Sequence, residues 1–165
     1  MKKLIISSLF MFFAATTVLK AGVTTFTKDD GGSEKIASTV LRHFGYTFYR
    51  ASDVTWTINK TYQKATFILN GKPTYAIYDL ENKFLVATQL VETKELPEKA
   101  QAELTTKFVD YKVANVLKVI ARPTDYQLQD DTNAYWVDLT SKADHLIAIA
   151  FPGSDFNIVK AEKIK

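Results

Sequence analysis

The sequence of 165 residues contains no cysteine and only two histidines. The lack of cysteine excludes disulfides, thiol nucleophiles, thiolate zinc sites and iron–sulfur ligation. Two histidines are also too few for a polyhistidine metal site. The six glycines are scattered along the chain, so no glycine-rich loop is available to bind a phosphate group. The sequence therefore predicts no cofactor and no metal ion.

Signatures of hydrolytic enzymes are also missing. No serine lies in a Gly-x-Ser-x-Gly or Ser-x-x-Lys pattern, which are common in exported serine hydrolases. His145 directly follows Asp144, but neighbouring residues of a strand point to opposite faces, so we do not expect these two side chains to pair. His43 is interpreted as a histidine at the edge of a helix with one hydrogen bond. The sequence thus predicts no catalytic residue and no enzymatic activity.

The first residues have the composition of a secretory signal. Lys2 and Lys3 precede a run of about a dozen mostly apolar residues, 4–15, which is shorter than the roughly 20 residues that span a bilayer. We interpret residues 1–21 as a signal peptide, with cleavage near Thr17 or after Ala21; the alternative is an uncleaved anchor. The expected location is the periplasm or the exterior, with no stable membrane insertion after cleavage.

The net charge of +3 belongs to that segment. The chain has 21 lysines and arginines and 18 acidic residues, and residues 1–21 hold three lysines and no acid. The mature chain is therefore balanced at 18 of each sign and has no net positive field to attract nucleic acid. We expect no nucleic-acid partner.

The mature chain alternates helical and strand patterns. Residues 22–32 are polar and predict a flexible leader. Ser33 is a candidate N-cap for a helix whose apolar stripe includes Ile36, Val40 and Phe44 and which is expected to stop at Gly45. Strands with period-two alternation are expected next, and Asn70-Gly71 is a strong hairpin signal. These strands cover Val54–Ile58, Tyr62–Leu69, Thr74–Leu80 and Phe84–Val91.

The pattern then starts again. Pro97 fits the first turn of a second helix, whose stripe is Ala100, Leu104 and Phe108. Further strands are expected at Val113–Ala121, Asp125–Gln129, Ala134–Thr140, His145–Phe151 and Phe156–Lys160. The run from Tyr75 to Ala87 resembles the run from Tyr135 to Ala148 with one gap, which suggests an internal duplication. The predicted fold class is α+β, with two tandem helix-plus-antiparallel-meander units, approximately 33–92 and 93–165, and the helices packed on one face of the sheets.

Several loose motifs carry a family resemblance. They are a strand with Val54-x-Trp56, the hairpin Asn70-Gly71-Lys72, the segment Leu96-Pro97-Glu98 and the segment Tyr111-Lys112-Val113. In this order they resemble the secreted β-lactamase-inhibitor-like domain of the PepSY-like group over roughly residues 34–163. The resemblance implies export to the bacterial envelope and a role in binding rather than catalysis. Phe108-Val109-Asp110-Tyr111 departs from the proline- or glycine-bearing turn expected after the second helix.

One strand suggests where a partner binds. Tyr135, Val137 and Leu139 share the apolar parity of their strand, whereas Trp136 shares the other parity with Asp138. A tryptophan on the polar parity is a candidate exposed anchor, and Tyr78 is a weaker one; the alternative is that Trp136 belongs to a second core layer. Accordingly, Trp136→Ala is expected to leave the fold nearly intact and to weaken partner binding.

The function predicted from these features is an exported, non-enzymatic binding protein that engages a protein or peptide partner through an open β-sheet face. The partner-binding candidates are Trp136, Asp138 and Tyr78. The alternative is an exported small-ligand carrier or hydrolase. A ligand site would require a closed pocket with converging polar groups, whereas a binding module would require a broad sheet face with aromatic residues.

Overall fold

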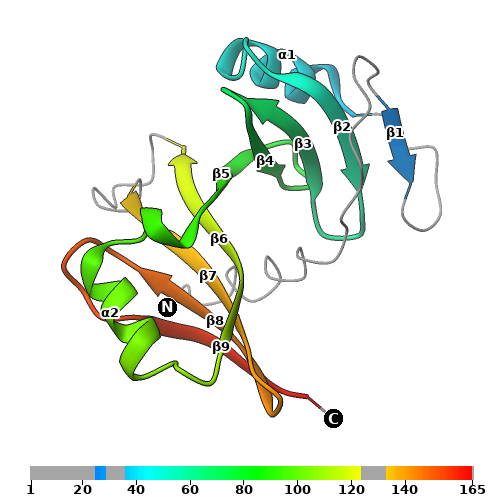
Figure 1. Cartoon of the computed structure of the whole chain (residues 1–165). Helices are drawn as coiled ribbons and strands as arrows, with labels where there is room; N and C mark the ends of the chain where they lie inside the picture. The colour runs from blue at the N-terminus through cyan, green and yellow to red at the C-terminus, as the bar shows by residue number, and fades with distance from the viewer. Residues whose placement is uncertain (1–24, 29–35, 124–132, 165) are drawn as a thin grey trace. The chain divides into compact units, whose positions relative to one another are not determined.

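A computed structural model describes residues 25–28, 36–123 and 133–164 (Figure 1). The predicted signal peptide, 1–21, and the strand predicted at 125–129 lie outside these residues. Contacts divide the chain into two units, which are described separately. In the described residues, the N-terminal unit extends to Gln89 and also includes residues 120–123, and the C-terminal unit comprises residues 90–119 and 133–164.

The N-terminal unit is built on consecutive strands. Four of them are antiparallel neighbours in chain order, whereas the first pairs in parallel with the second, from Thr25 opposite Thr55 to Lys28 opposite Ile58. Asn70 and Gly71 have φ values of 53° and 75°, the left-handed conformation that a two-residue hairpin requires. The predicted hairpin is thus confirmed. The strands are β1 (Thr25–Lys28), β2 (Ser52–Ile58), β3 (Gln63–Leu69), β4 (Lys72–Tyr78) and β5 (Phe84–Val91).

One helix, α1 (Ser38–Thr47), covers a face of this sheet. Val40, Phe44 and Phe48 recur at one-turn spacing and are buried against Trp56 and Phe67 of the strands. The Phe44 ring meets that of Phe67 edge-on, with centroids 5.0 Å apart. The predicted stop at Gly45 is wrong, because the helix continues to Thr47. Phe48, the first residue after the helix, is buried, and Gly45 does not adopt a left-handed conformation.

The C-terminal unit contains one α-helix and antiparallel strands. Ala100 of the helix is buried with Val116, Val137 and Leu139 of the strands, and Phe108 and Phe156 pack at the edge of this cluster. Pro97 is the residue that precedes the helix. The elements are η1 (Thr93–Glu95), α2 (Glu98–Thr106), β6 (Lys112–Ala121), β7 (Tyr135–Thr140), β8 (Asp144–Ala150) and β9 (Asn157–Lys163).

The predicted fold class, α+β with two tandem helix-plus-antiparallel-meander units, is wrong. The structure is mostly β-sheet: its described residues form nine strands but only two α-helices, of 10 and 9 residues. One strand pairing is parallel, and it involves β1, in the segment predicted to be a flexible leader.

The two sequence segments matched in the predicted duplication also differ in the direction of their side chains. Tyr75 of β4 pairs with Thr66 and alternates with Ala76, which is in the core beneath α1. Its sequence match, Tyr135 of β7, lies in the core beneath α2. The matched tyrosines therefore point to opposite faces relative to the helix, because a similarity in strand-rich sequence does not preserve the pleat.

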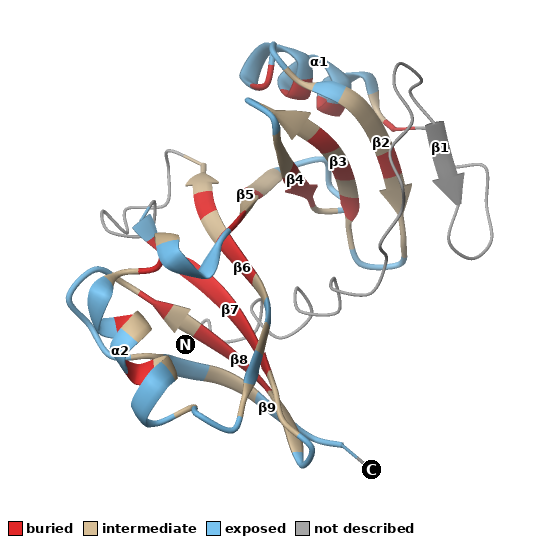
Figure 2. Ribbon diagram, in the orientation of Figure 1, coloured by how far each residue is buried: buried red, intermediate tan, exposed pale blue. Residues whose placement is uncertain are grey.

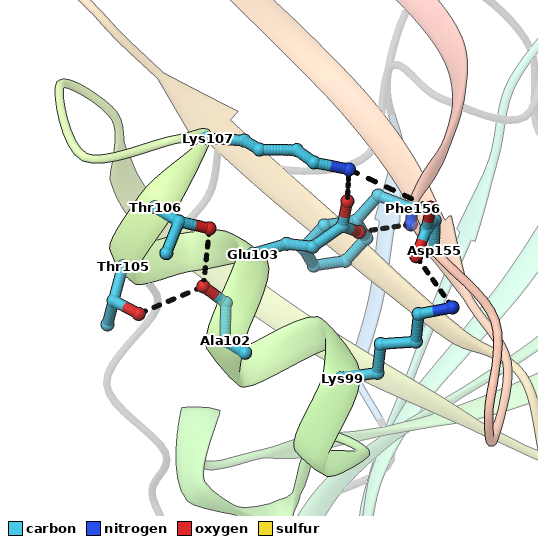
Figure 3. A network of polar contacts seen from close by, with 8 residues as sticks. All are labelled: Lys99, Ala102, Glu103, Thr105, Thr106, Lys107, Asp155 and Phe156. Atoms are coloured by element: carbon cyan, nitrogen blue, oxygen red, sulfur yellow. Dashed lines mark hydrogen bonds and ion pairs between the residues drawn. The ribbon is translucent and has the colours of Figure 1, made fainter.

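A buried carboxylate attaches α2 to the loop between β8 and β9 (Figure 3). Glu103 is 6% exposed; its Oε2 accepts the backbone N–H of Phe156 at 2.5 Å and its Oε1 lies 2.5 Å from Nζ of Lys107. Asp155 of the same loop pairs with Lys99 at 2.9 Å, and this hydrogen bond lowers the pKa of Asp155. These contacts hold the loop against the helix.

Candidate functional site

The sheet of the C-terminal unit has a second face, away from α2. The cross-strand register places Leu117, Trp136 and Ile149 in one row of it. Asn115, Asp138, Ile147 and Lys160 form the next row, followed by His145 and Glu162. We call these nine residues the helix-free face. None of them belongs to the core cluster beneath α2, so the face combines an aromatic and aliphatic row with a charged row.

The partner-binding candidates occupy two different places. Trp136 and Asp138 lie together on the helix-free face, as their shared parity predicted. Tyr78 is instead in the core of the N-terminal unit, beneath α1. All three are buried, with 8%, 3% and 0% of their surfaces exposed. Trp136 and Tyr78 are therefore not exposed anchors, and the burial of Trp136 agrees with the alternative that it belongs to a second core layer. A role for these residues in binding stays a prediction.

Asp138 is paired with a histidine that sequence reasoning did not connect to it. Nε2 of His145 is hydrogen-bonded to Oδ1 of Asp138, and His145 is half-buried. The β7–β8 hairpin pairs Thr140 with His145, which makes Asp138 a diagonal neighbour of His145 on the same face. Asp144, as predicted, does not pair with His145; its carboxylate accepts the Ser141 hydroxyl at 2.6 Å.

Two charged side chains of β9 extend the same face. Glu162 lies opposite His145, and Lys160 lies opposite Ile147. Nζ of Lys160 is 2.7 Å from Oε1 of Glu162, and this hydrogen bond lowers the pKa of Glu162. The face thus carries two neighbouring polar pairs: the largely buried Asp138–His145 hydrogen bond and the Lys160–Glu162 ion pair at the edge of the sheet. Charges arranged in this way discriminate between partners more than they add affinity.

The other histidine has a structural role. Nδ1 of His43 lies 2.9 Å from the Tyr78 hydroxyl, and its ring is tilted over Phe84 with centroids 5.1 Å apart. Burial raises the pKa of Tyr78 well above its usual value. The structure agrees with the prediction of a helix-edge histidine, although Thr47 adds a second, longer contact at 3.4 Å.

The N-terminal sheet also has a face away from α1. On it, Nζ of Lys64 lies 6.0 Å from the centroid of the Tyr75 ring. Burial lowers the pKa of Lys64 and raises the pKa of Tyr75. Thr66 and Thr88 pair with Tyr75 on either side, so polar side chains surround the Tyr75 ring on this face.

A groove in the C-terminal unit is the nearest feature to a ligand site. It encloses about 480 Å³, is open to solvent, and is lined by residues 90–94 and 113–116. Its two charged side chains, Glu92 and Lys94, pair with each other at 2.7 Å and are largely exposed. In the part of the chain that the structure describes, no three His, Asp or Glu residues are arranged to hold a metal ion. The groove therefore lacks converging buried polar groups.

Comparison with known proteins identifies the fold. No protein-family model and no curated protein sequence matches the chain. Solved structures do match: a DUF2874 family protein from Bacteroides uniformis has a TM-score of 0.61 at 18% identity, covering 78% of this chain and 90% of its own. A BLIP-like protein from Bacteroides fragilis has a TM-score of 0.62 at 12% identity, covering 81% and 89%.

A protein of Bacteroides eggerthii, provisionally described as periplasmic, has a TM-score of 0.61 at 17% identity, covering 79% of this chain and 91% of its own. These matches show that the chain has the fold of the BLIP-like and DUF2874 proteins. The β-lactamase-inhibitor-like part of the predicted resemblance is thus confirmed at the level of fold. Among the described helices, neither is long and apolar enough to cross a membrane.

Proposed function

We propose that this protein is an exported, non-enzymatic binding protein of the PepSY-like group that engages a protein or peptide partner through the helix-free face. The observation that carries this proposal is the composition of that face. The part of the face that stays accessible holds Ile149, His145 and Lys160, beside the buried Trp136 and Asp138. An aromatic and aliphatic centre with charges beside it is the usual anatomy of a protein interface.

Two further observations support export and binding. The first residues have a signal-like pattern, and a structural neighbour is provisionally described as periplasmic. Another neighbour is described as BLIP-like. The open groove does not favour the alternative of a small-ligand carrier or hydrolase. Its charged residues pair with each other rather than converge on a ligand. Because proteins of one fold can have different functions, the proposal rests on the residues of the helix-free face rather than on the fold.

The experiment is affinity capture from an envelope extract with residues 22–165 as bait, quantified by mass spectrometry. Ile149→Lys places a charge in the aromatic row, and Asn157→Arg changes the exposed β9 residue that pairs with Ile149 and extends the helix-free face at its edge. Val109→Lys is the control, since Val109 is 70% exposed and is not part of this face. A protein retained by the wild type and the control but lost from both face variants supports the proposal. Equal capture by all four baits contradicts it.

A further inference from the structure

The outer side of α1 and the turn that follows it carry the two most exposed aromatic residues among the described residues. Tyr46 is 89% exposed and Tyr49 is 74% exposed, whereas Phe44 and Phe48 on the inner side are buried. Tyr46 lies one helical turn after Arg42, and Tyr49 follows in the turn that leaves the helix. Figure 2 shows the exposed outer side of α1. A tyrosine offers a large contact area at a small cost in conformational entropy.

These side chains are not explained by the packing of the unit. The hydroxyl of Tyr46 makes no hydrogen bond with any described residue, and its ring lies outside the core. The Tyr49 ring contacts the guanidinium of Arg50, whose Cζ is 5.2 Å from the ring centroid. Within residues 36–123 and 133–164, Arg42 and Arg50 have no acidic partner. Arg42 lies in the helix interior and Arg50 lies beyond the last turn, so neither is placed to stabilise the helix dipole.

The charge on α1 and the turn after it is of one sign. Residues 36–52 contain Arg42 and Arg50 and no acidic residue, and the nearest acids along the chain are Glu34 and Asp53. Arginine guanidinium groups bind carboxylates in a bidentate manner, and tyrosine and arginine are enriched at interface hot spots. A partner that complements this surface must therefore supply carboxylates.

We infer that Arg42, Tyr46, Tyr49 and Arg50 form a docking surface for an acidic peptide segment of a protein partner. The two tyrosine rings provide the apolar contact, and the two guanidinium groups pair with glutamate or aspartate side chains. This surface belongs to the N-terminal unit and is independent of the helix-free face. A neutral polysaccharide could stack on the tyrosines but would leave both guanidinium groups without a charge to bind.

The test is fluorescence anisotropy of residues 22–165 with a fluorescein-labelled peptide of ten alternating Glu and Asp residues. The matched probe is a peptide of ten alternating Gln and Asn residues. We expect the acidic peptide to bind and to lose at least tenfold in affinity between 50 and 200 mM salt. The neutral peptide is expected not to bind. Equal binding of both peptides, or no binding of the acidic one at 50 mM salt, would overturn the inference.

Variants of the four residues test whether the acidic peptide binds at this surface. We expect two double variants, Tyr46→Ala/Tyr49→Ala and Arg42→Gln/Arg50→Gln, each to lower the affinity for the acidic peptide at least tenfold. Their thermal midpoints are expected to stay unchanged, because all four side chains are exposed. The control Lys60→Gln/Lys142→Gln removes the same charge from two exposed positions elsewhere. A loss in this control as large as in the arginine variant would show non-specific attraction and overturn the inference. Ile149→Lys tests the proposed function and is expected to leave this binding unchanged, so the two proposals can fail separately.

Discussion

Nε2 of His145 on β8 is hydrogen-bonded to the carboxylate of Asp138 on β7, which is 3% exposed. The imidazole compensates a carboxylate that the sheet has largely removed from water. Leaving a buried polar group without a partner costs about 1–3 kcal/mol, whereas removing both partners costs less. Substituting either residue of this pair therefore tests whether the hydrogen bond stabilises the helix-free face.

We predict that His145→Leu lowers the free energy of unfolding by about 1–3 kcal/mol at pH 7. Asp138→Asn/His145→Leu is expected to lose less than the sum of its two single variants, because the carboxylate no longer needs a partner. Urea denaturation of the four proteins measures this double-mutant cycle. Additive losses would show that the two side chains do not interact in solution.

Trp136→Ala is predicted to destabilise the protein by about 3–5 kcal/mol, since the side chain is only 8% exposed. This reverses the expectation from sequence that the variant folds normally. Trp136→Phe keeps most of the apolar volume and is expected to lose less. Tyr46→Ala, at an 89% exposed aromatic residue, is the control and is expected to change stability by less than about 0.5 kcal/mol. Thermal and urea unfolding of residues 22–165 supply the measurement. Equal stability of the Trp136→Ala variant and the wild type would restore the idea of a surface anchor.

Glu103→Ala is predicted to lower the free energy of unfolding by about 1–3 kcal/mol, because it removes a buried side chain and leaves the part-buried N–H of Phe156 without its acceptor. Glu103→Gln keeps a carbonyl acceptor for this N–H and loses only the pairing with Lys107, so its loss is expected to be smaller. Amide hydrogen exchange at Phe156 is the decisive measurement. Unchanged protection in the alanine variant would show that the loop is held by other contacts.

Tyr78 makes the stability of the protein decrease at alkaline pH. Its folded-state pKa lies above the unfolded value near 10, so the unfolded chain releases this proton first. The stabilising contribution is complete below about pH 10 and is lost as the pH rises above it. Urea titrations from pH 8 to 11 are expected to show a shallower decline for Tyr78→Phe than for the wild type. Some decline persists, since burial also raises the pKa of Tyr75. Identical slopes in the two proteins would refute the prediction.

Asp144 contributes to the loss of stability at acidic pH. The hydrogen bond from Ser141, followed by that from Tyr111, lowers the pKa of its carboxyl group below 3.8. Its contribution to stability is present above that value and is lost as the pH falls through the folded-state pKa. Ser141→Ala is predicted to raise the pKa of Asp144 toward its ordinary value, as followed by NMR titration of the carboxyl carbon. The adjacent exposed Lys142→Ala is the control and is expected to have a smaller effect.

Local patterns predicted most individual elements. Period-two alternation located the strands around Trp56, Tyr75 and Trp136, and Asn70-Gly71 identified its hairpin, because pleat and turn geometry depend on neighbouring residues alone. Helix ends were less predictable. Gly45 has the composition of a helix stop, but burial of Phe48 one position after the observed end rewards a longer helix.

The sequence by itself determined which strand residues share a face, so it correctly separated Trp136 from Tyr135. Only the tertiary structure decided what each face contacts: Trp136 and Asp138 are buried, Tyr78 lies beneath a helix, and the carboxylate that pairs with His145 is that of Asp138. It also showed that the matched tyrosines 75 and 135 point in opposite directions. The physical reason is that alternation is a property of one strand, whereas burial and cross-strand pairing depend on register and on residues distant in the chain.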